Sequence, residues 1–120
     1  MEPQAFIPYG RQWIDEEDER AVLSALRSDF LTQGPATRQF ETELADYVGA
    51  RYAVSLSSAT AGLHLSVAAL DLGAGEGITT PITFVATSNA MAYCGLTPVF
   101  ADIEPDSLNL SLSATRAAMT

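Results

Sequence analysis

The residues best suited to chemistry in this sequence form a short run of small and hydroxyl-bearing side chains, Ser57, Ser58, Ala59 and Thr60. The run stands between an apolar segment and a segment of helical periodicity, which predicts the start of a helix. The first turn of a helix offers unpaired N–H groups and a partial positive charge, so it suits an anion such as phosphate. A plain N-cap by Ser57 or Ser58 explains the same residues, and the sequence leaves both interpretations open.

Three other features are weaker candidates for a site. The glycine run 73–77 resembles a dinucleotide-binding loop, but it follows a helix and carries Glu76, so we interpret it as a turn. His64 has no second histidine and only Cys94 as a soft partner, so we expect it to be structural and expect no metal site. Phe84 suits either core packing or exposure in a crevice, and core packing is the simpler expectation.

These residues must be positioned by helices and strands, and the chain alternates the two. Asp15 is expected to cap a first helix that carries Val22, Leu23 and Leu26 at helical spacing. Further helices are predicted over 36–48, 59–72 and 84–93 and from Ser113, and strands over 52–56, 78–80 and 98–102. Such alternation predicts βαβ units and a mainly parallel sheet. Ligands of such sheets bind beyond the carboxyl ends of the strands, so the positions of interest are 57–60, 81–84 and 102–106.

Composition narrows the class of protein. The 120 residues suit one domain, which we expect over 15–120 after an N-terminal arm over 1–14. A net charge of −9, with six arginines and no lysine, argues against nucleic acid and anionic membranes as partners. A single cysteine cannot form an internal disulfide, which favours the cytoplasm. We see neither a signal peptide nor a run of about 18 apolar residues, as a membrane span requires.

Six motifs, in order along the chain, resemble the DegT/DnrJ/EryC1/StrS aminotransferases. They are residues 7–12 (IPYGRQ), 28–35 (SDFLTQGP), 47–54 (YVGARYAV), 58–64 (SATAGLH), 80–89 (TPITFVATSN) and 99–105 (VFADIEP). Each motif is weak alone, and the six in register are specific. Within the family they are most similar to the branch that aminates a UDP-linked 4-keto-6-deoxy-N-acetyl hexose on the way to pseudaminic acid.

The resemblance implies an α/β fold, namely an incomplete part of the large domain of a fold type I transferase that uses pyridoxal phosphate, with a mainly parallel sheet flanked by helices. It implies a homodimer, a UDP-sugar substrate and an amino-acid donor, glutamate. The family's phosphate-binding turn maps onto Ser58, Ala59 and Thr60, and the aromatic that stacks on the cofactor ring maps onto Phe84. The loop of Thr32, Gln33 and Gly34 matches a segment near the substrate. Arg11 and Arg38 are plausible UDP contacts that no motif singles out.

The sequence departs from the family in three respects. The family's Schiff-base lysine and its pyridine-binding aspartate are expected further along than Thr120, and Asp102 does not match that aspartate. The turn before Ile78 is one residue shorter than usual, which would reverse the faces of the next strand. We therefore expect no catalytic residue in these 120 residues and no activity from them alone. The alternatives are a non-catalytic remnant or a small phosphate-binding α/β module. A dehydratase with histidine in place of lysine is disfavoured because His64 is misplaced.

Overall fold

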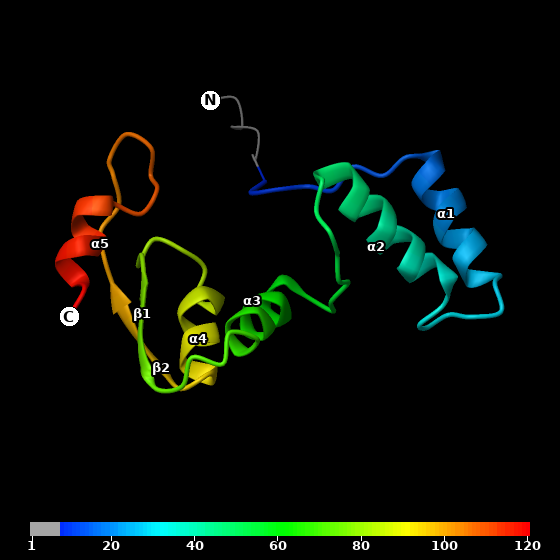
Figure 1. Ribbon diagram of the computed structural model, residues 1–120. Coiled ribbons are helices and arrows are strands. Elements are labelled where there is room, and N and C mark those ends of the chain that lie inside the picture. Colours follow the sequence, from blue (N-terminus) through cyan, green and yellow to red (C-terminus); the bar gives the residue numbers. More distant parts are fainter. Residues whose placement is uncertain (1–7) are drawn as a thin grey trace, which may run out of the picture. The chain divides into compact units, whose positions relative to one another are not determined.

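The computed structural model describes residues 8–120, so the start of the predicted arm and of the first motif lies outside the described residues. The chain divides into two compact units, Met1–Ser55 and Leu56–Thr120, which we describe separately. The first contains helices α1 (Glu16–Leu26) and α2 (Pro35–Val48) (Figure 1). The second contains α3 (Ala59–Ala68), β1 (Gly75–Thr79), α4 (Ala86–Tyr93), β2 (Leu96–Phe100) and α5 (Leu112–Ala118).

Helix α1 begins where its capping residues predict. The Asp15 carboxylate accepts hydrogen bonds from the backbone N–H groups of Glu17 and Asp18, at 2.8 and 3.2 Å. The Asp18 carboxylate in turn accepts from the N–H of Asp15 at 3.1 Å, which completes a capping box. Four acidic residues fill the first turn, where the helix dipole favours negative charge.

Helix α2 is framed by the residue types that start and stop helices. Pro35 occupies the first helical position after the N-cap Gly34, where its missing N–H costs nothing. Gly49 closes the helix in the left-handed conformation with a φ of 69°, and the N–H of Ala50 reaches back to the carbonyl of Ala45 at 2.9 Å. The predicted span of 36–48 is therefore confirmed to within one residue.

The predicted strand over 52–56 is wrong. These residues are irregular, and no strand among the described residues pairs with them. Their alternating apolar pattern satisfies only half of what a strand needs, because the ladder also requires a neighbour. The N–H of Ser55 instead donates to the Glu41 carboxylate at 2.7 Å.

The second unit contains the predicted parallel βαβ arrangement. β1 and β2 are parallel and adjacent, in register from Gly75 opposite Leu96 to Thr79 opposite Phe100, and α4 connects them. The N–H of Ala101 extends the ladder by donating to the Thr79 carbonyl at 2.8 Å. The chain is thus α/β with a parallel sheet and flanking helices, as expected from the sequence.

Several boundaries differ from prediction. α3 ends at Ala68 rather than at 72, because Asp71 and Gly73 adopt left-handed backbone conformations with φ of 47° and 69°. The glycine run 73–77 is not a single turn, since its last three residues pair in β1. β2 spans 96–100 instead of 98–102, α4 begins at Ala86 instead of 84, and α5 begins at Leu112 after its cap Ser111. The shortened turn still leads into a regularly paired strand.

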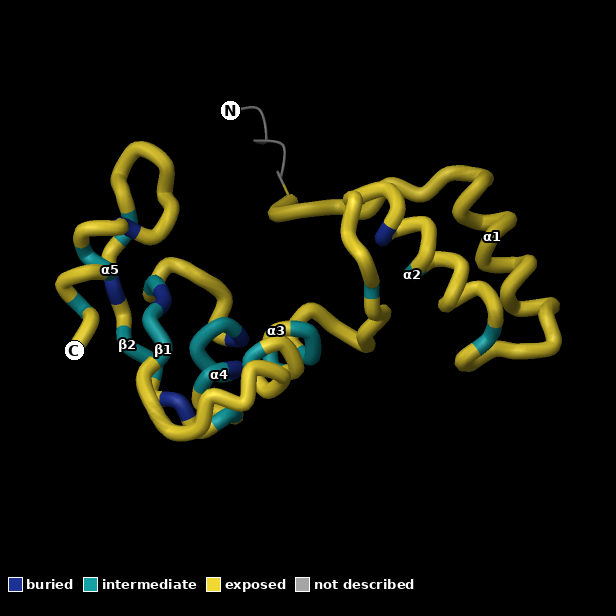
Figure 2. Tube along the Cα trace, viewed as in Figure 1, coloured by how far each residue is buried: buried dark blue, intermediate teal, exposed yellow. Residues whose placement is uncertain are grey.

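The core is small. Its buried apolar residues are Ala45 in the first unit and Ala86, Ala90, Leu96 and Ala101 in the second (Figure 2). The accessible surface is 10519 Å². One globule of this mass would expose about 6,200 Å², and two separate globules of half the mass about 7,500 Å². Much apolar side-chain surface that is normally buried is therefore exposed here.

Among residues 8–120, no helix is both long enough and apolar enough to cross a membrane.

Candidate functional site

The predicted anion site lies at the start of α3. Ser58 is the N-cap, in an extended conformation, and its Oγ accepts a hydrogen bond from the N–H of Ala61 at 3.1 Å. The N–H of Gly62 begins the helical ladder by donating to the Ser58 carbonyl. The N–H groups of Ala59 and Thr60 precede that ladder, so helix geometry gives them no partner within α3. The cap and the anion site use different N–H groups, and the two interpretations are compatible.

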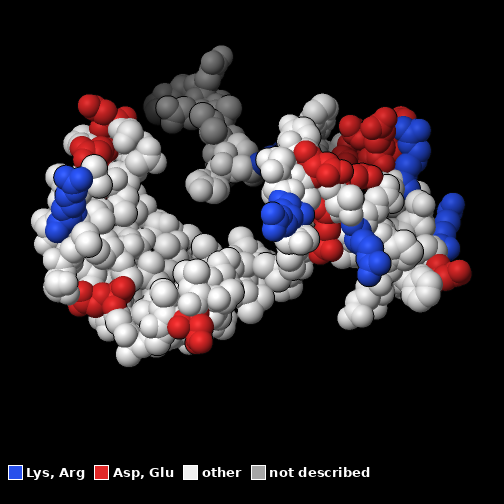
Figure 3. All heavy atoms as spheres, in the orientation of Figure 1, with Lys and Arg blue, Asp and Glu red and all other residues white. Residues whose placement is uncertain are grey.

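The surroundings of this turn suit a phosphate. No acidic residue lies in the first turn of α3, whereas four fill that of α1. Ser58, Ala59 and Thr60 are exposed, so a ligand can reach the backbone and the Thr60 hydroxyl. One turn along, a Cβ at Gly62 would lie 3.3 Å from Leu56 Cδ1, so glycine allows the incoming chain to pack closely against the helix. The second unit also carries few charged side chains, as the mainly white surface in Figure 3 shows.

Phe84 lies in the loop between β1 and α4, beyond the carboxyl end of β1. Its side chain is 74% exposed, so the expectation of core packing is wrong for this chain. The loop is ordered by two local contacts: the N–H of Ile82 donates to Thr80 Oγ1 at 3.1 Å, and the hydroxyls of Thr83 and Thr87 lie 3.1 Å apart. The aromatic ring therefore stands on a short, locally bonded loop.

The structure unites some of the predicted site residues and separates others. Ser58, Ala59 and Thr60 share one helical turn, and α3 packs against α4, the helix that follows Phe84. The loop after β2 lies at the same edge of the sheet as Phe84, because the two strands are parallel and in register. Its Asp102 carboxylate accepts a hydrogen bond from the N–H of Ile103 at 2.8 Å. The predicted substrate loop belongs to the other unit.

Part of that loop lines an open pocket of about 470 Å³. Gln33 and Gly34 line the pocket, and Thr32 precedes them without lining it. Gln33 has a φ of 52°, a left-handed conformation that costs a non-glycine residue about 1 kcal/mol. A Cβ at Gly34 would lie 2.9 Å from Phe30 Cβ and 3.1 Å from the Phe30 carbonyl oxygen, so a larger residue here would force this loop to shift.

Sequence reasoning missed the aromatic member of this pocket, Phe30, and its acidic member, Glu41. Of the two arginines considered for UDP, Arg38 lines the pocket. Arg38 and Glu41 lie three residues apart on the predicted helix, which was the available signal that they share a face. The bend at Gln33, which brings Phe30 against the start of α2, has no sequence signal of its own.

His64 has the structural surroundings expected of it. Its ring contacts that of Tyr93 edge to face, with centroids 5.4 Å apart and an interplanar angle of 69°. Its carbonyl accepts a weak hydrogen bond from the Cys94 thiol at 3.8 Å. No group of three or more potential metal ligands occurs within the described part of the chain.

Residues 12–120 match the DegT/DnrJ/EryC1/StrS aminotransferase family. A relative from Shewanella sediminis, UDP-4-amino-4-deoxy-L-arabinose–oxoglutarate aminotransferase, is 40% identical over 96% of this chain and 30% of its own length. Helicobacter pylori PseC, an aminotransferase of pseudaminic acid biosynthesis, has a TM-score of 0.85 at 36% identity, over 94% of this chain and 31% of that one.

A different reaction occurs on the same local fold. The GDP-4-keto-6-deoxy-D-mannose-3-dehydratase of E. coli, with bound hydrated pyridoxal phosphate, has a TM-score of 0.84 at 28% identity, over 94% of this chain and 31% of that one. This chain spans about three tenths of the length of the curated relatives it matches. The match over residues 12–120, which is more than half of the chain, establishes that the protein belongs to the DegT/DnrJ/EryC1/StrS aminotransferase family.

Proposed function

We propose that this 120-residue chain forms the phosphate-binding part of a nucleotide-sugar aminotransferase that uses pyridoxal phosphate. The observation that carries this is the start of α3, where Ser58 caps the helix and leaves the N–H groups of Ala59 and Thr60 for a ligand. A dianionic phosphate is stabilised there by the N–H donors, the helix dipole and the Thr60 hydroxyl. The absence of first-turn acids removes the main electrostatic obstacle.

Phe84 is proposed to cover one face of the cofactor ring. A flat apolar face excludes water and restrains the ring by stacking. When bound, pyridoxal phosphate supplies the carbonyl carbon that accepts an amino group and the ring that withdraws electrons from it. The residues of this chain bind and orient the cofactor rather than carry out that chemistry.

The substrate is proposed to be a UDP-linked 4-keto-6-deoxy-N-acetyl hexose, with glutamate as amino donor and a homodimer as the working enzyme of the cytoplasm. Support comes from two relatives of this chain, a UDP-4-amino-4-deoxy-L-arabinose–oxoglutarate aminotransferase and an aminotransferase of pseudaminic acid biosynthesis. The dehydratase match shows that the local fold does not distinguish amino transfer from dehydration. The sugar and the donor therefore rest on sequence similarity.

The 120 residues alone are proposed to be inactive. They contain no lysine, and amino transfer of this kind needs an amine both to hold the cofactor and to move a proton. Turnover of a UDP-4-keto sugar with glutamate by the 120-residue chain would contradict this.

The experiment that tests the phosphate site uses two probes without an aldehyde, pyridoxine 5′-phosphate and pyridoxine. Neither can form an imine with an amine, so calorimetric titration reports only non-covalent binding. We expect the phosphorylated probe to bind at least about tenfold more tightly, as a charge-assisted hydrogen bond contributes about 1.5–3 kcal/mol. Thr60→Val should remove about tenfold of that preference.

The matched control is Thr42→Val. Thr42 is a helical threonine of the other unit, and its hydroxyl donates to the Arg38 carbonyl at 3.0 Å. The change therefore removes a hydroxyl that is not part of the proposed phosphate site. Equal affinities for the two probes would refute the phosphate site. Equal losses in both threonine variants would show that Thr60 has no specific role.

The alternative is a stand-alone module that binds phosphate at the same turn, and such a module would have to be stable by itself. Its surface of 10519 Å² exceeds that of two separate globules of half the mass, so much of its apolar area is unpartnered. We therefore favour the enzyme over the module.

A further inference from the structure

The pocket at the start of α2 is lined by an aromatic ring and a guanidinium group that the motif of its loop does not account for. Phe30, Gly34, Pro35 and Arg38 are among the residues that line it. Phe30 is 62% exposed, so its ring is available to a ligand. A hollow of about 470 Å³ falls within the range of about 300–1,000 Å³ that small-molecule sites occupy.

We propose that this pocket holds the nucleoside diphosphate of the substrate, with Arg38 binding the diphosphate and Phe30 offering its ring to the base. The inference rests on the proposed function, because it takes a nucleotide sugar as the substrate. Arg38 becomes a substrate-binding residue, and the loop of Gln33 and Gly34 shapes the hollow between the two side chains.

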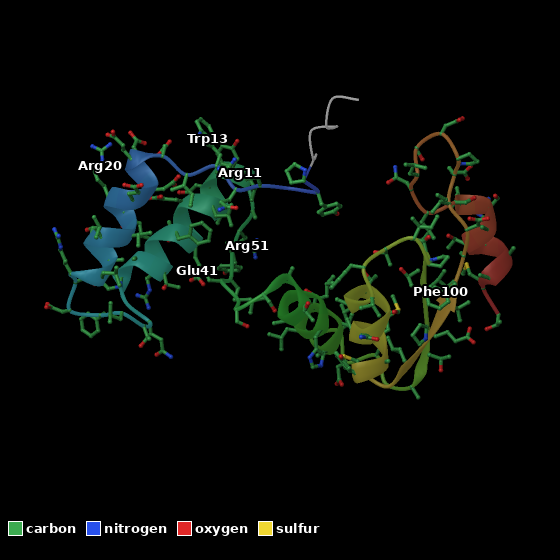
Figure 4. The ribbon with its side chains drawn as sticks, turned by 180° about the vertical axis from the view of Figure 1, so that it is seen from behind. Arg11, Trp13, Arg20, Glu41, Arg51 and Phe100 are labelled. Atoms are coloured by element: carbon green, nitrogen blue, oxygen red, sulfur yellow. The ribbon has the colours of Figure 1, made fainter. Side chains whose placement is uncertain are left out.

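The pocket carries one cationic and one acidic side chain, and the cation is the one suited to phosphate oxygens. Arg38 is its cation, and a guanidinium donates two parallel hydrogen bonds to phosphate oxygens. Glu41 is the acidic residue of the wall, and one of its oxygens is engaged by the N–H of Ser55 at 2.7 Å. Figure 4 shows Glu41 on α2 and Arg51 on the segment that follows that helix. The first turn of α2 carries no acidic residue.

A second hollow adjoins the first along the same turn of α2. It measures about 250 Å³, shares Arg38 and Glu41 with the first, and adds Arg51 and Tyr52. A ligand that binds at Arg38 can therefore extend in either direction along the helix. A nucleoside diphosphate has both an extended anion and an aromatic base, whereas glutamate, the proposed amino donor, has no ring to stack on Phe30.

The experiment titrates the 120-residue chain with UDP and with uridine, in wild type and in Arg38→Gln. We expect Arg38→Gln to weaken UDP binding by about 10- to 100-fold, the loss of a charge-assisted pair, and to leave uridine binding unchanged. Added salt should weaken UDP binding in wild type more than in the variant. Arg38→Lys keeps the charge without the fork and should bind UDP with intermediate affinity.

Arg20→Gln is the matched control, because Arg20 lies on α1 outside the pocket, and its Nε donates to the Glu16 carbonyl at 3.0 Å. It should bind UDP as wild type does. Circular dichroism should show the same helix content in each variant as in wild type, and Arg38→Lys carries the test if Arg38→Gln loses helix. Unchanged UDP affinity in Arg38→Gln, or no UDP binding by wild type, would overturn the inference. Binding of pyridoxine 5′-phosphate tests the proposed function separately, and Arg38→Gln should leave the affinity for that probe unchanged.

Discussion

Replacing Gly77 by alanine should loosen the packing of α4 on β1, because the space that a Cβ would need is occupied by Met91. An ideal Cβ at position 77 would lie 2.6 Å from Met91 Sδ, 3.1 Å from its Cγ and 3.4 Å from its Cε. Non-bonded heavy atoms pack at about 3.5–4.0 Å, so the sulfur must move by about 1 Å or more. Overpacking of this kind costs about 1–3 kcal/mol, and the flexibility of methionine favours the lower half of that range.

The backbone effect has the opposite sign and must be separated from the clash. Alanine in a strand is about 0.5–1 kcal/mol more favourable than glycine. Gly75→Ala isolates this gain, since a Cβ there would meet only Leu96 Cδ2 at an ordinary 3.7 Å. We expect the Gly77→Ala chain to be less stable than the Gly75→Ala chain by about 1–2 kcal/mol, which is the cost of the clash, because the backbone gain is common to both variants and cancels.

The assay is native-state hydrogen exchange of the β1–β2 ladder, which reports local opening even where global unfolding is not cooperative. The Ala101 N–H, which donates to the Thr79 carbonyl at 2.8 Å, is a suitable probe. Met91→Ala in the Gly77→Ala background should restore protection, and the double-mutant cycle gives the coupling between the two positions. Equal protection in the two glycine variants, or strictly additive effects of Gly77→Ala and Met91→Ala, would refute this packing of α4.

Three further predictions concern single contacts. Ser111→Ala should lower the free energy of unfolding, measured with urea, by about 1–2 kcal/mol, and Ser111→Thr should lower it less. The reason is that Ser111, which is 5% exposed, accepts from the N–H of Ala114 at the start of α5 and donates to the Glu104 carboxylate. Gln33→Gly should stabilise the chain by up to about 1 kcal/mol by relieving the φ of 52°, whereas Gln33→Val should destabilise it in the same titration. Glu41→Ala should speed hydrogen exchange at the Ser55 amide about tenfold, because it removes the acceptor of that N–H. Glu41→Gln keeps an acceptor oxygen and should change the exchange rate less. Equal exchange rates in the two variants would argue against the contact.

The sequence predicted best those features that depend on neighbouring residues. Asp15 and Gly49 fixed two helix ends, because a cap and a left-handed stop are set within one turn. The start of α3 at Ser58 followed for the same reason. The parallel βαβ unit also followed, since strands separated by a helix have few other topologies available.

The failures occurred where a distant partner decides the outcome. Residues 52–56 have strand character, but none of the strands within residues 8–120 pairs with them. Phe84 is apolar, yet its side chain is 74% exposed. The glycines of β1 are typical of a turn, yet they form a strand because they pair with β2, and the Met91 side chain occupies the space over Gly77. The pocket beside Gly34 required Phe30 to fold back onto the start of α2, which depends on the left-handed Gln33.

The two parts of the proposed cofactor site, the phosphate turn and the Phe84 ring, differ in the same way: the first depends on neighbouring residues and the second on a distant surface. The phosphate turn uses backbone donors and a cap within residues 58–61, so its geometry is complete as soon as α3 forms. Stacking by Phe84 needs a second surface to exclude water, and a ring that is 74% exposed offers only one face. Phosphate should therefore account for most of the affinity of this chain for pyridoxine 5′-phosphate. Phe84→Leu should lower that affinity less than Thr60→Val does, and the reverse order would mean that the aromatic face, rather than the helix start, determines binding.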